Sequence, residues 1–161
     1  MKEKDIKKLS KKLDLLKIDL EHDINIGSSH DVLIYGDIST EQKDDILSRI
    51  NIRFSETSST SDVTVRIVNR SNVIVELFVC VITASGIKNI TSTLDMRGLI
   101  LGRGQINFTP ALEIDEMDVS VDHRSTIGTY DLSQVEYLRS RGLSKEQSLD
   151  IIAKGFFEGI G

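Results

Sequence analysis

The chain is 161 residues long, and 39% of its residues are hydrophobic while 28% are charged. This length and apolar content predict one ordinary domain with a hydrophobic core of its own. The formal net charge of -5 gives the molecule no general positive field, which argues against nucleic acid and against an anionic membrane surface as partners.

The amino-terminal segment MKEKDIKKLSKKLDLLKIDL is basic, but lysine and aspartate interrupt its apolar residues throughout. It therefore lacks the continuous apolar region and the small-residue cleavage site of a secretion signal. No run of about 20 apolar residues occurs elsewhere, so we expect a soluble, cytoplasmic protein. Apolar residues recur at helical spacing from Ile6 through Leu9 and Leu13 to Leu16, which predicts an amphipathic helix over residues 3–17.

From Asp23 the sequence changes to short runs rich in isoleucine and valine, such as VLIY, VTVRIV and VIVELFVCVIT. Such runs predict strands, so the middle of the chain is expected to be a β-rich body. A sandwich, a barrel and a β-helix all fit this pattern, since no fixed short repeat is visible. The segment STEQKDDILSRI is an exception, because Ser39 and Gln42 have capping-box spacing and an apolar stripe follows. We expect a short helix over residues 39–50.

Two capped helices are predicted near the carboxyl terminus. Asp131 is a suitable first cap, with Gln134 three residues later, and Gly142 stands where a left-handed residue ends a helix. Ser144 and Gln147 repeat the capping-box spacing for a second helix. The apolar residues of the two helices are Leu132, Val135, Leu138, Leu149, Ile152, Ala153 and Phe156. The pattern is typical of a compact helical hairpin.

Cys80 is the only cysteine, and it lies within the apolar run VIVELFVCVI. The chain alone can therefore form neither a disulfide nor a site made of cysteines only, and any cluster that it touches must be shared with another chain. We expect Cys80 to be a buried, unreactive core thiol. His22 and His30 are expected at the surface or in turns, without a functional role.

The segment from Asp118 to Ile160 carries the most specific pattern of the chain. It reads DVSVDHRSTIGTYDLSQVEYLRSRGLSKEQSLDIIAKGFFEGI. A strand leads to His123, a turn with Ser125 and Thr126 follows, and the next helix contains YLRSRG. This order closely resembles the carboxy-terminal end of the SUF iron–sulfur assembly scaffolds, SufB and SufD. The upstream PALEI is similar to the strand that precedes this block, and the β-rich remainder is compatible with the family.

The resemblance implies that the β-rich body is a short right-handed parallel β-helix. The expected fold is therefore mainly β, with an N-terminal amphipathic helix and a C-terminal helical hairpin. The resemblance implies a single SufB/SufD-like domain over residues 1–161. Its parts would be the N-terminal helix (1–20), the β-rich body (21–128) and the hairpin (129–161). Family members are a good deal longer than this chain, so we expect a shortened β-helix with fewer coils.

The resemblance also implies the function of a non-catalytic scaffold subunit in iron–sulfur cluster assembly. Its C-terminal helices would recruit a SufC-like ABC-type ATPase, and its β body would meet a second SufB/SufD-like chain in a homodimer or heterodimer. The residues carried over as the ATPase-docking surface are Tyr137, Leu138, Arg139, Arg141, Gly142, Leu143 and Phe156. Arg139 and Arg141 are the best candidates for contact, because charged side chains two residues apart do not both face one core. The apolar members are explained equally well by packing of the hairpin onto the β body.

His123 is carried over as the family's interface histidine, a ligand for iron or for a transient iron–sulfur cluster shared with a partner chain. Asp122 would add carboxylate oxygens if both side chains turned to one side, although neighbours in a regular strand point to opposite faces. Arg124 replaces the Glu or Gly that is common in the family, and its fixed charge disfavours a nearby cation. SufB-like members carry a cysteine in the stretch that reads LDMRGLILG here, where this chain has Met96, and a thioether is a poor substitute for a thiolate on iron. These two departures make the chain more similar to SufD than to SufB, and the sequence context of Cys80 does not match the family cysteine. A hydrogen-bonded turn histidine is the simpler alternative.

The sequence also carries weaker signals for two other classes of function. The acidic residues Glu113, Asp115, Glu116, Asp118 and Asp122 could supply paired carboxylates, as in carbohydrate-active β-helices. Acids at strand ends are more often a solvated rim, and the absence of a GxxxxGK[ST] phosphate loop argues against ATP hydrolysis by this chain. We therefore expect no enzyme. The alternative to the scaffold is a stand-alone β-helical interaction module that has lost cluster assembly.

Overall fold

Alternating isoleucine, valine and leucine residues give the middle of the chain long strands with one buried face. This computed structural model describes residues 9–17, 20–115 and 118–159. Its strands are β1 (Leu9–Asp14), β2 (Glu21–Ile26), β3 (His30–Ile38), β4 (Ile46–Phe54), β5 (Thr60–Asn69), β6 (Ile74–Thr83), β7 (Ile90–Ile100), β8 (Gln105–Ile114) and β9 (Val119–Thr129). A 3₁₀ turn, η1 (Leu15–Lys17), follows β1, and the helices α1 (Leu132–Ser140) and α2 (Lys145–Glu158) follow β9.

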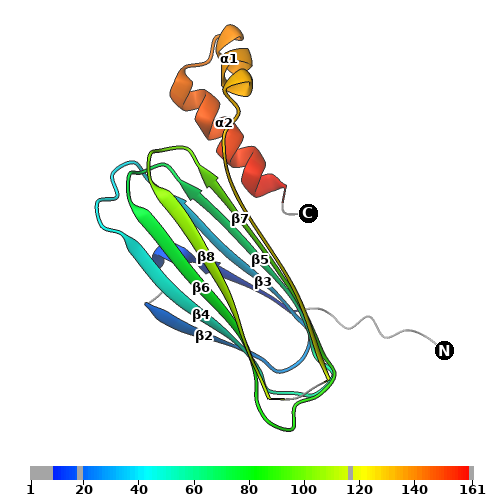
Figure 1. Cartoon of the computed structure of the whole chain (residues 1–161). Helices are drawn as coiled ribbons and strands as arrows, with labels where there is room; N and C mark the ends of the chain where they lie inside the picture. The colour runs from blue at the N-terminus through cyan, green and yellow to red at the C-terminus, as the bar shows by residue number, and fades with distance from the viewer. Residues whose placement is uncertain (1–8, 18–19, 116–117, 160–161) are drawn as a thin grey trace, which may run out of the picture.

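The strands form two parallel sheets that face each other across one core (Figure 1). The odd-numbered sheet has the order β1-β3-β5-β7-β9, and the even-numbered sheet has the order β2-β4-β6-β8. From β2 onward, each turn of the chain adds one strand to each sheet, which gives the four coils of a β-solenoid. The mainly β, parallel β-helical fold is thus confirmed, and stacking of coil upon coil excludes the sandwich and the barrel.

The core is a stack of inward-facing aliphatic side chains. Ile34, Val65 and Met96 hold equivalent positions in three successive coils, and each has an exposed fraction of 0%. Removal of such columns from water supplies the main driving force for folding. Equivalent positions lie 31 residues apart between Val65 and Met96 but 29 apart between Met96 and Ser125. The repeat therefore has no constant length, which is why the sequence does not show it.

The helix expected over residues 3–17 is wrong in its described part. Leu9–Asp14 forms strand β1, which pairs in parallel with β3, and only Leu15–Lys17 makes a short 3₁₀ turn. Pairing with β3 satisfies backbone hydrogen-bonding groups and outweighs the helical spacing of the apolar residues, because local propensity is a weak preference. Residues 1–8 lie outside the described residues.

The helix expected over residues 39–50 is also wrong. The Gln42 N–H donates to the Ser39 carbonyl at 3.2 Å, which closes a turn, and strand β4 begins at Ile46. β4 is held between β2 and β6, with Ile50 directed inward and fully buried while Leu47 is exposed on the outer side. The capping-box spacing therefore marks a turn, and the apolar residues after it follow the two-residue period of a strand.

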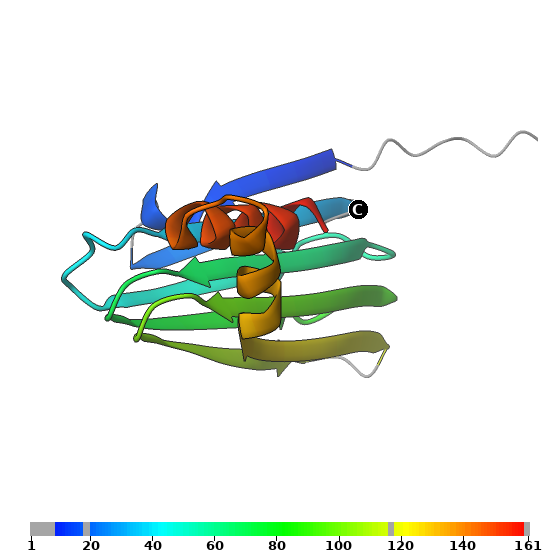
Figure 2. The ribbon, with the colours of Figure 1, turned by 90° about the horizontal axis from the view of Figure 1, so that it is seen from above.

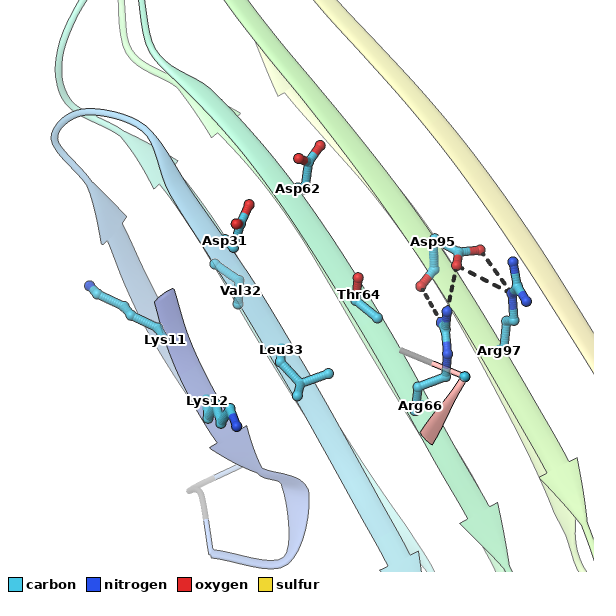
Figure 3. A pocket seen from close by; sticks show the side chains of 11 residues that line it. Lys11, Lys12, Asp31, Val32, Leu33, Asp62, Thr64, Arg66, Asp95 and Arg97 are labelled. Atoms are coloured by element: carbon cyan, nitrogen blue, oxygen red, sulfur yellow. Dashed lines mark hydrogen bonds and ion pairs between the residues drawn. The ribbon is translucent and has the colours of Figure 1, made fainter. Parts of the chain in front are cut away.

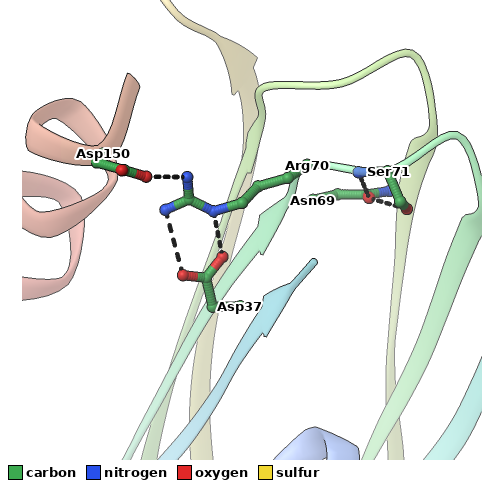
Figure 4. Close-up of polar contacts among 5 residues, drawn as sticks. All are labelled: Asp37, Asn69, Arg70, Ser71 and Asp150. Carbon is green, nitrogen blue, oxygen red and sulfur yellow. Dashed lines mark hydrogen bonds and ion pairs between the residues drawn. The ribbon is translucent and has the colours of Figure 1, made fainter. Parts of the chain in front are cut away.

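The turn between β5 and β6 is built around the buried side chain of Asn69 (Figure 4). Its Nδ2 donates to the carbonyls of Val73 and Gln105 at 2.9 and 3.1 Å, and its Oδ1 accepts from the Ser71 N–H at 3.0 Å. The next coil passes so close to this turn that a Cβ on Gly104 would overlap the Val73 carbonyl oxygen. Only glycine fits there.

Replacing Gly104 with alanine is expected to destabilise the fold by about 1–3 kcal/mol, because the added methyl group must push two coils apart. Urea denaturation of the purified variant measures this loss. Gly128→Ala is the matched control, since a Cβ at Gly128 would meet no atom within 4 Å. Equal stabilities of the two variants would contradict the close approach at Gly104.

The C-terminal helical hairpin is confirmed together with its local signals. Asp131 caps α1 by accepting from the Ser133 N–H at 2.9 Å, and Ser144 and Gln147 form both halves of a capping box on α2. Gly142 has a φ of 95°, the left-handed conformation that ends α1. In the described part of the chain, no helix is both long enough and apolar enough to cross a membrane.

The hairpin lies across one end of the strands. Seen from above, α1 leaves β9 and leads to α2, which lies over earlier coils (Figure 2). Phe156 of α2 packs against a small second core that contains Val68. Arg70, directly after β5, donates to Asp37 of β3 at 2.7 Å and to Asp150 of α2 at 2.6 Å (Figure 4). Apolar packing and this double ion pair fix the hairpin on the solenoid.

Candidate functional site

Strands β8 and β9 leave one end of the solenoid uncovered, because each pairs with a single strand among the described residues. Inward-facing side chains that a further coil would cover form a surface that we call the open end. Its residues are Phe108, Pro110, Leu112, Ile114, Val119, Val121, His123, Ser125 and Ile127. Leu112, Ile114 and Ile127 have exposed fractions of 44%, 36% and 40%. An apolar row of this kind beside two unpaired strand edges is typical of an interaction surface.

The β1–β2 end of the solenoid differs in character. Lys11 occupies an inward-facing position on the edge strand β1, opposite Val32, and its Nζ donates to the Asn25 carbonyl of β2 at 3.1 Å. An inward charge on an edge strand opposes the addition of another strand. Leu15 of η1 is 2% exposed and fills space beside Gly36. The open end is therefore the better candidate for pairing with a second chain.

His123 lies in the open end, where it pairs in register with the buried Leu94 of the preceding coil and is itself exposed. Asp122 pairs with Thr93 and faces the outer side of the sheet, where its carboxylate accepts from Arg124 at 3.2 Å. The two residues expected as joint ligands are thus not brought together. Arg124 also faces outward, so its positive charge lies on the opposite side of the strand from the imidazole.

No described residues form a group of three or more His, Cys, Asp or Glu side chains that could hold a metal ion. Cys80 is buried as expected, with an exposed fraction of 1%, but it lies on the outer side of the even-numbered sheet between Asn51 and Ala111. Burial, followed by the negative charge of Glu113, raises the pKa of the Cys80 thiol. The thiolate that binds iron is therefore disfavoured there.

The acidic residues considered for a hydrolytic site do not share one surface. Glu113 faces outward from the even-numbered sheet, whereas Asp122 faces outward from the odd-numbered sheet on the other side of the solenoid. Asp115 and Asp118 are exposed in the segment between β8 and β9, and Glu116 lies outside the described residues. The placement of Glu113 and Asp122 fits a solvated rim better than a pair of catalytic carboxylates.

The hairpin offers a second exposed surface. Tyr137 of α1 is 59% exposed, and the Arg141 guanidinium lies 5.2 Å from the centre of its ring. A shallow groove of about 410 Å³ runs between the two helices. Its lining residues, which we call the hairpin groove, are Ser133, Gln134, Tyr137, Leu138, Ile151 and Ile152. This surface is mainly apolar and has an aromatic ring and an arginine at its side.

The predicted docking residues divide between this surface and the packing of the hairpin. Arg139 is exposed at the end of α1, and Leu143 is half-buried in the turn after Gly142. Phe156 packs toward the second core, so it supports the hairpin from inside. Ile151, which the sequence reasoning missed, is 46% exposed and lines the groove. Ile151 follows Leu149 by two residues and precedes Ile152 by one, so it lies off the apolar stripe of the helix, and this spacing could have indicated its exposure.

A polar pocket of about 460 Å³ opens on the outer side of the odd-numbered sheet (Figure 3). Arg66, only 4% exposed, donates to the Asp95 carboxylate at 2.7 Å, and Arg97 approaches the same carboxylate at 3.2 Å. Partial burial opposes the charged form, but the hydrogen bond and charge of Arg66 prevail and lower the pKa of Asp95. These charges are paired within the fold, so we assign this pocket no ligand.

Comparison with known proteins identifies a family for this chain. A family model described as SUF system FeS cluster assembly, SufBD core domain, matches residues 24–156. The chain is similar to an iron–sulfur cluster assembly SufBD family protein of Mycobacterium leprae, with 39% identity over 73 residues, 44% of this chain and 19% of the relative. It is similar to a SufBD family protein of Archaeoglobus fulgidus, with 36% identity over 66 residues, 40% of this chain and 18% of the relative.

The iron–sulfur cluster assembly protein SufD of Bacillus subtilis is 43% identical over 58 residues, 36% of this chain and 13% of that protein. The matched segments span less than a fifth of these three relatives. The family model, by contrast, covers most of the chain, from β2 into α2. The chain therefore belongs to the SufBD core family of the SUF iron–sulfur cluster assembly system.

Proposed function

We propose that this chain is a non-catalytic scaffold subunit in iron–sulfur cluster assembly. Membership of the SufBD core family supports a role in that process. The observation that carries the proposal is the open end, where an exposed apolar row and His123 lie on one inward-facing surface. A second SufB/SufD-like chain pairs with this surface, and the nascent cluster is cargo that forms between the two chains.

Pairing at the open end uses two kinds of contact. The outer edges of β8 and β9 offer backbone N–H and carbonyl groups to strands of the second chain. Leu112, Ile114 and Ile127 then lose water together, which supplies the hydrophobic part of the association. Because the same surface can serve both partners, the pair is either a homodimer or a heterodimer with a longer scaffold.

Within the pair, His123 contributes one ligand to the cluster. A neutral imidazole nitrogen is a suitable ligand for iron, and the exposed side chain of His123 faces the second chain. Cys80 is buried on the outer side of the other sheet, so thiolate ligands must come from the partner. The cluster is thus shared and transient, and this chain alone does not hold it.

A SufC-like ABC-type ATPase docks on the hairpin. Tyrosine and arginine are the residues that most often dominate binding at interfaces, and Tyr137 and Arg141 lie together beside the hairpin groove. The apolar groove accepts a side chain of the ATPase next to Ile151. Because Arg70 links α2 to β3, a displacement of the hairpin by the ATPase is passed on to the coils.

Co-purification tests the proposed recruitment. The tagged chain is expressed with a SufC-like ATPase and isolated under native conditions, and the ATPase is expected to elute with it in a constant ratio. In a second format, the tagged chain is expressed without the ATPase, purified, and then mixed with purified ATPase. Retention in this format shows that the contact is direct. If the wild-type chain retains no ATPase in either format, recruitment through the hairpin is wrong.

The alternative is a stand-alone β-helical interaction module that has lost cluster assembly. It is favoured by the lack, among the described residues, of any group of three potential metal ligands. Such a module would still pair through the open end but would not support a cluster. Iron–sulfide reconstitution of the paired chains separates the two functions.

A further inference from the structure

Polar side chains form a row inside the otherwise aliphatic solenoid. His30, Ser61 and Ser92 hold equivalent inward-facing positions near the starts of β3, β5 and β7, in three successive coils. Their exposed fractions are 8%, 1% and 1%. Thr83, 2% exposed, ends β6 at the same end of the strands, just before the turn that leads into β7. We call these four residues the internal polar row. The expectation that His30 lies at the surface or in a turn is therefore wrong, because the alternation of β3 directs its side chain inward.

The polar atoms of this row lack partners within the described part of the chain. They are Nδ1 of His30 and the hydroxyl oxygens of Ser61, Ser92 and Thr83. Folded proteins satisfy nearly all such buried groups, with protein atoms or with ordered water. The four unsatisfied groups lie close to one end of a single core, and they need a bound partner.

Two side chains at this level of the interior, those of Ser61 and Ser92, are smaller than the side chains that follow them. The next inward positions along the same strands hold the larger, fully buried Val32, Val63 and Leu94. Where those strands carry Ser61 and Ser92, the side chains are shorter and end in hydroxyl groups. A hydroxyl both donates and accepts, which matches the bonding needs of water. The row offers a metal ion one imidazole nitrogen and no carboxylate or thiolate, which is fewer strong ligands than a bound metal ion requires.

We propose that the internal polar row binds ordered water molecules inside the solenoid. The waters bridge the hydroxyl groups of Ser61 and Ser92 in successive coils, and they connect these to Thr83 and to Nδ1 of His30. Each water then has the two to four polar partners that buried water requires, about three on average. The row is independent of the proposed scaffold function, since it involves neither the open end nor the hairpin.

A crystal structure of the full chain at a resolution that shows ordered water tests the proposal directly. Peaks within hydrogen-bond distance of Ser61 Oγ and Ser92 Oγ are expected. The Ser61→Ala/Ser92→Ala variant should lose these peaks, and its urea midpoint should fall, because the waters lose their partners. Ser120→Ala is the control, since Ser120 is exposed on the outer side of β9.

A dry row gives the opposite results. Removing hydroxyl groups that lack any partner relieves their desolvation, so the double variant would then be more stable than the wild type. A wild-type map without water at the row, or a raised midpoint of the double variant, would overturn the proposal. If the double variant does not fold, the wild-type map and the single Ser92→Ala variant still decide between the two outcomes.

Discussion

Replacing Leu112 with aspartate is expected to separate the proposed scaffold pair into single chains. Leu112 is 44% exposed and lies in β8 at the centre of the open end, between the inward-facing Pro110 and Ile114. In the pair its side chain leaves water, and a carboxylate at that position would be buried without a partner. Loss of a central interface residue weakens binding by about 2 kcal/mol or more, roughly a thirtyfold rise in Kd.

Size-exclusion chromatography with light scattering measures this change over a series of concentrations. Leu47→Asp is the matched control, because Leu47 is 48% exposed on the outer side of the even-numbered sheet and should leave the mass unchanged. A Leu112→Asp variant that keeps the mass of the pair would show that the chains associate elsewhere. A wild-type chain that remains monomeric, both alone and after mixing with a second SufB/SufD-like chain, would contradict pairing altogether.

The Tyr137→Ala/Arg141→Ala variant is expected to lose the SufC-like ATPase on native purification. The guanidinium of Arg141 lies 5.2 Å from the Tyr137 ring centre, so the two side chains form one contact patch. Truncation of one interface residue of this kind weakens binding by about 2 kcal/mol, and about 1.4 kcal/mol corresponds to a tenfold change in Kd. The two truncations together are therefore expected to reduce retention by roughly a hundredfold or more.

The control for the hairpin variant is Lys154→Ala. Lys154 is 76% exposed on α2 and makes a surface ion pair with Glu158, which contributes little to stability. This variant should retain the ATPase at the wild-type level. Circular dichroism and urea denaturation establish that the double variant is folded. A folded double variant that binds the ATPase normally would show that the hairpin groove is not the docking site.

The elements that could be predicted from the sequence are those whose signals are local. Asp131, Gly142 and Ser144 act through bonds to residues a few positions away, so the helical hairpin followed from their spacing. The two helices that were predicted wrongly lie in segments whose conformation depends on distant residues. Residues 9–14 and 39–50 carry helix-like spacing, but their conformation is decided by strands that lie far along the chain. Such pairing energies are not visible in a short window.

The candidate site shows the same division. His123 was identified through its sequence context, and the alternation of β9 then separates it from Asp122. The apolar alternation of β8 was visible, but nothing in it revealed that Leu112 would stay uncovered, because this depends on the absence of a following strand in the described chain. The internal polar row could not be predicted without knowledge of the strand register, since Ser61 and Ser92 become neighbours only when the coils are stacked.

We propose that His123 at the open end helps to hold a nascent cluster between two chains. Anaerobic iron–sulfide reconstitution of the chain with its SufB/SufD-like partner and ATPase, followed by absorbance, tests it most directly. Wild type and Asp122→Ala should both gain the iron–sulfur absorbance, because Asp122 faces the other side of β9. His123→Ala should lose it. Equal absorbance in the wild-type and His123→Ala complexes, or none in the wild type, would contradict the account.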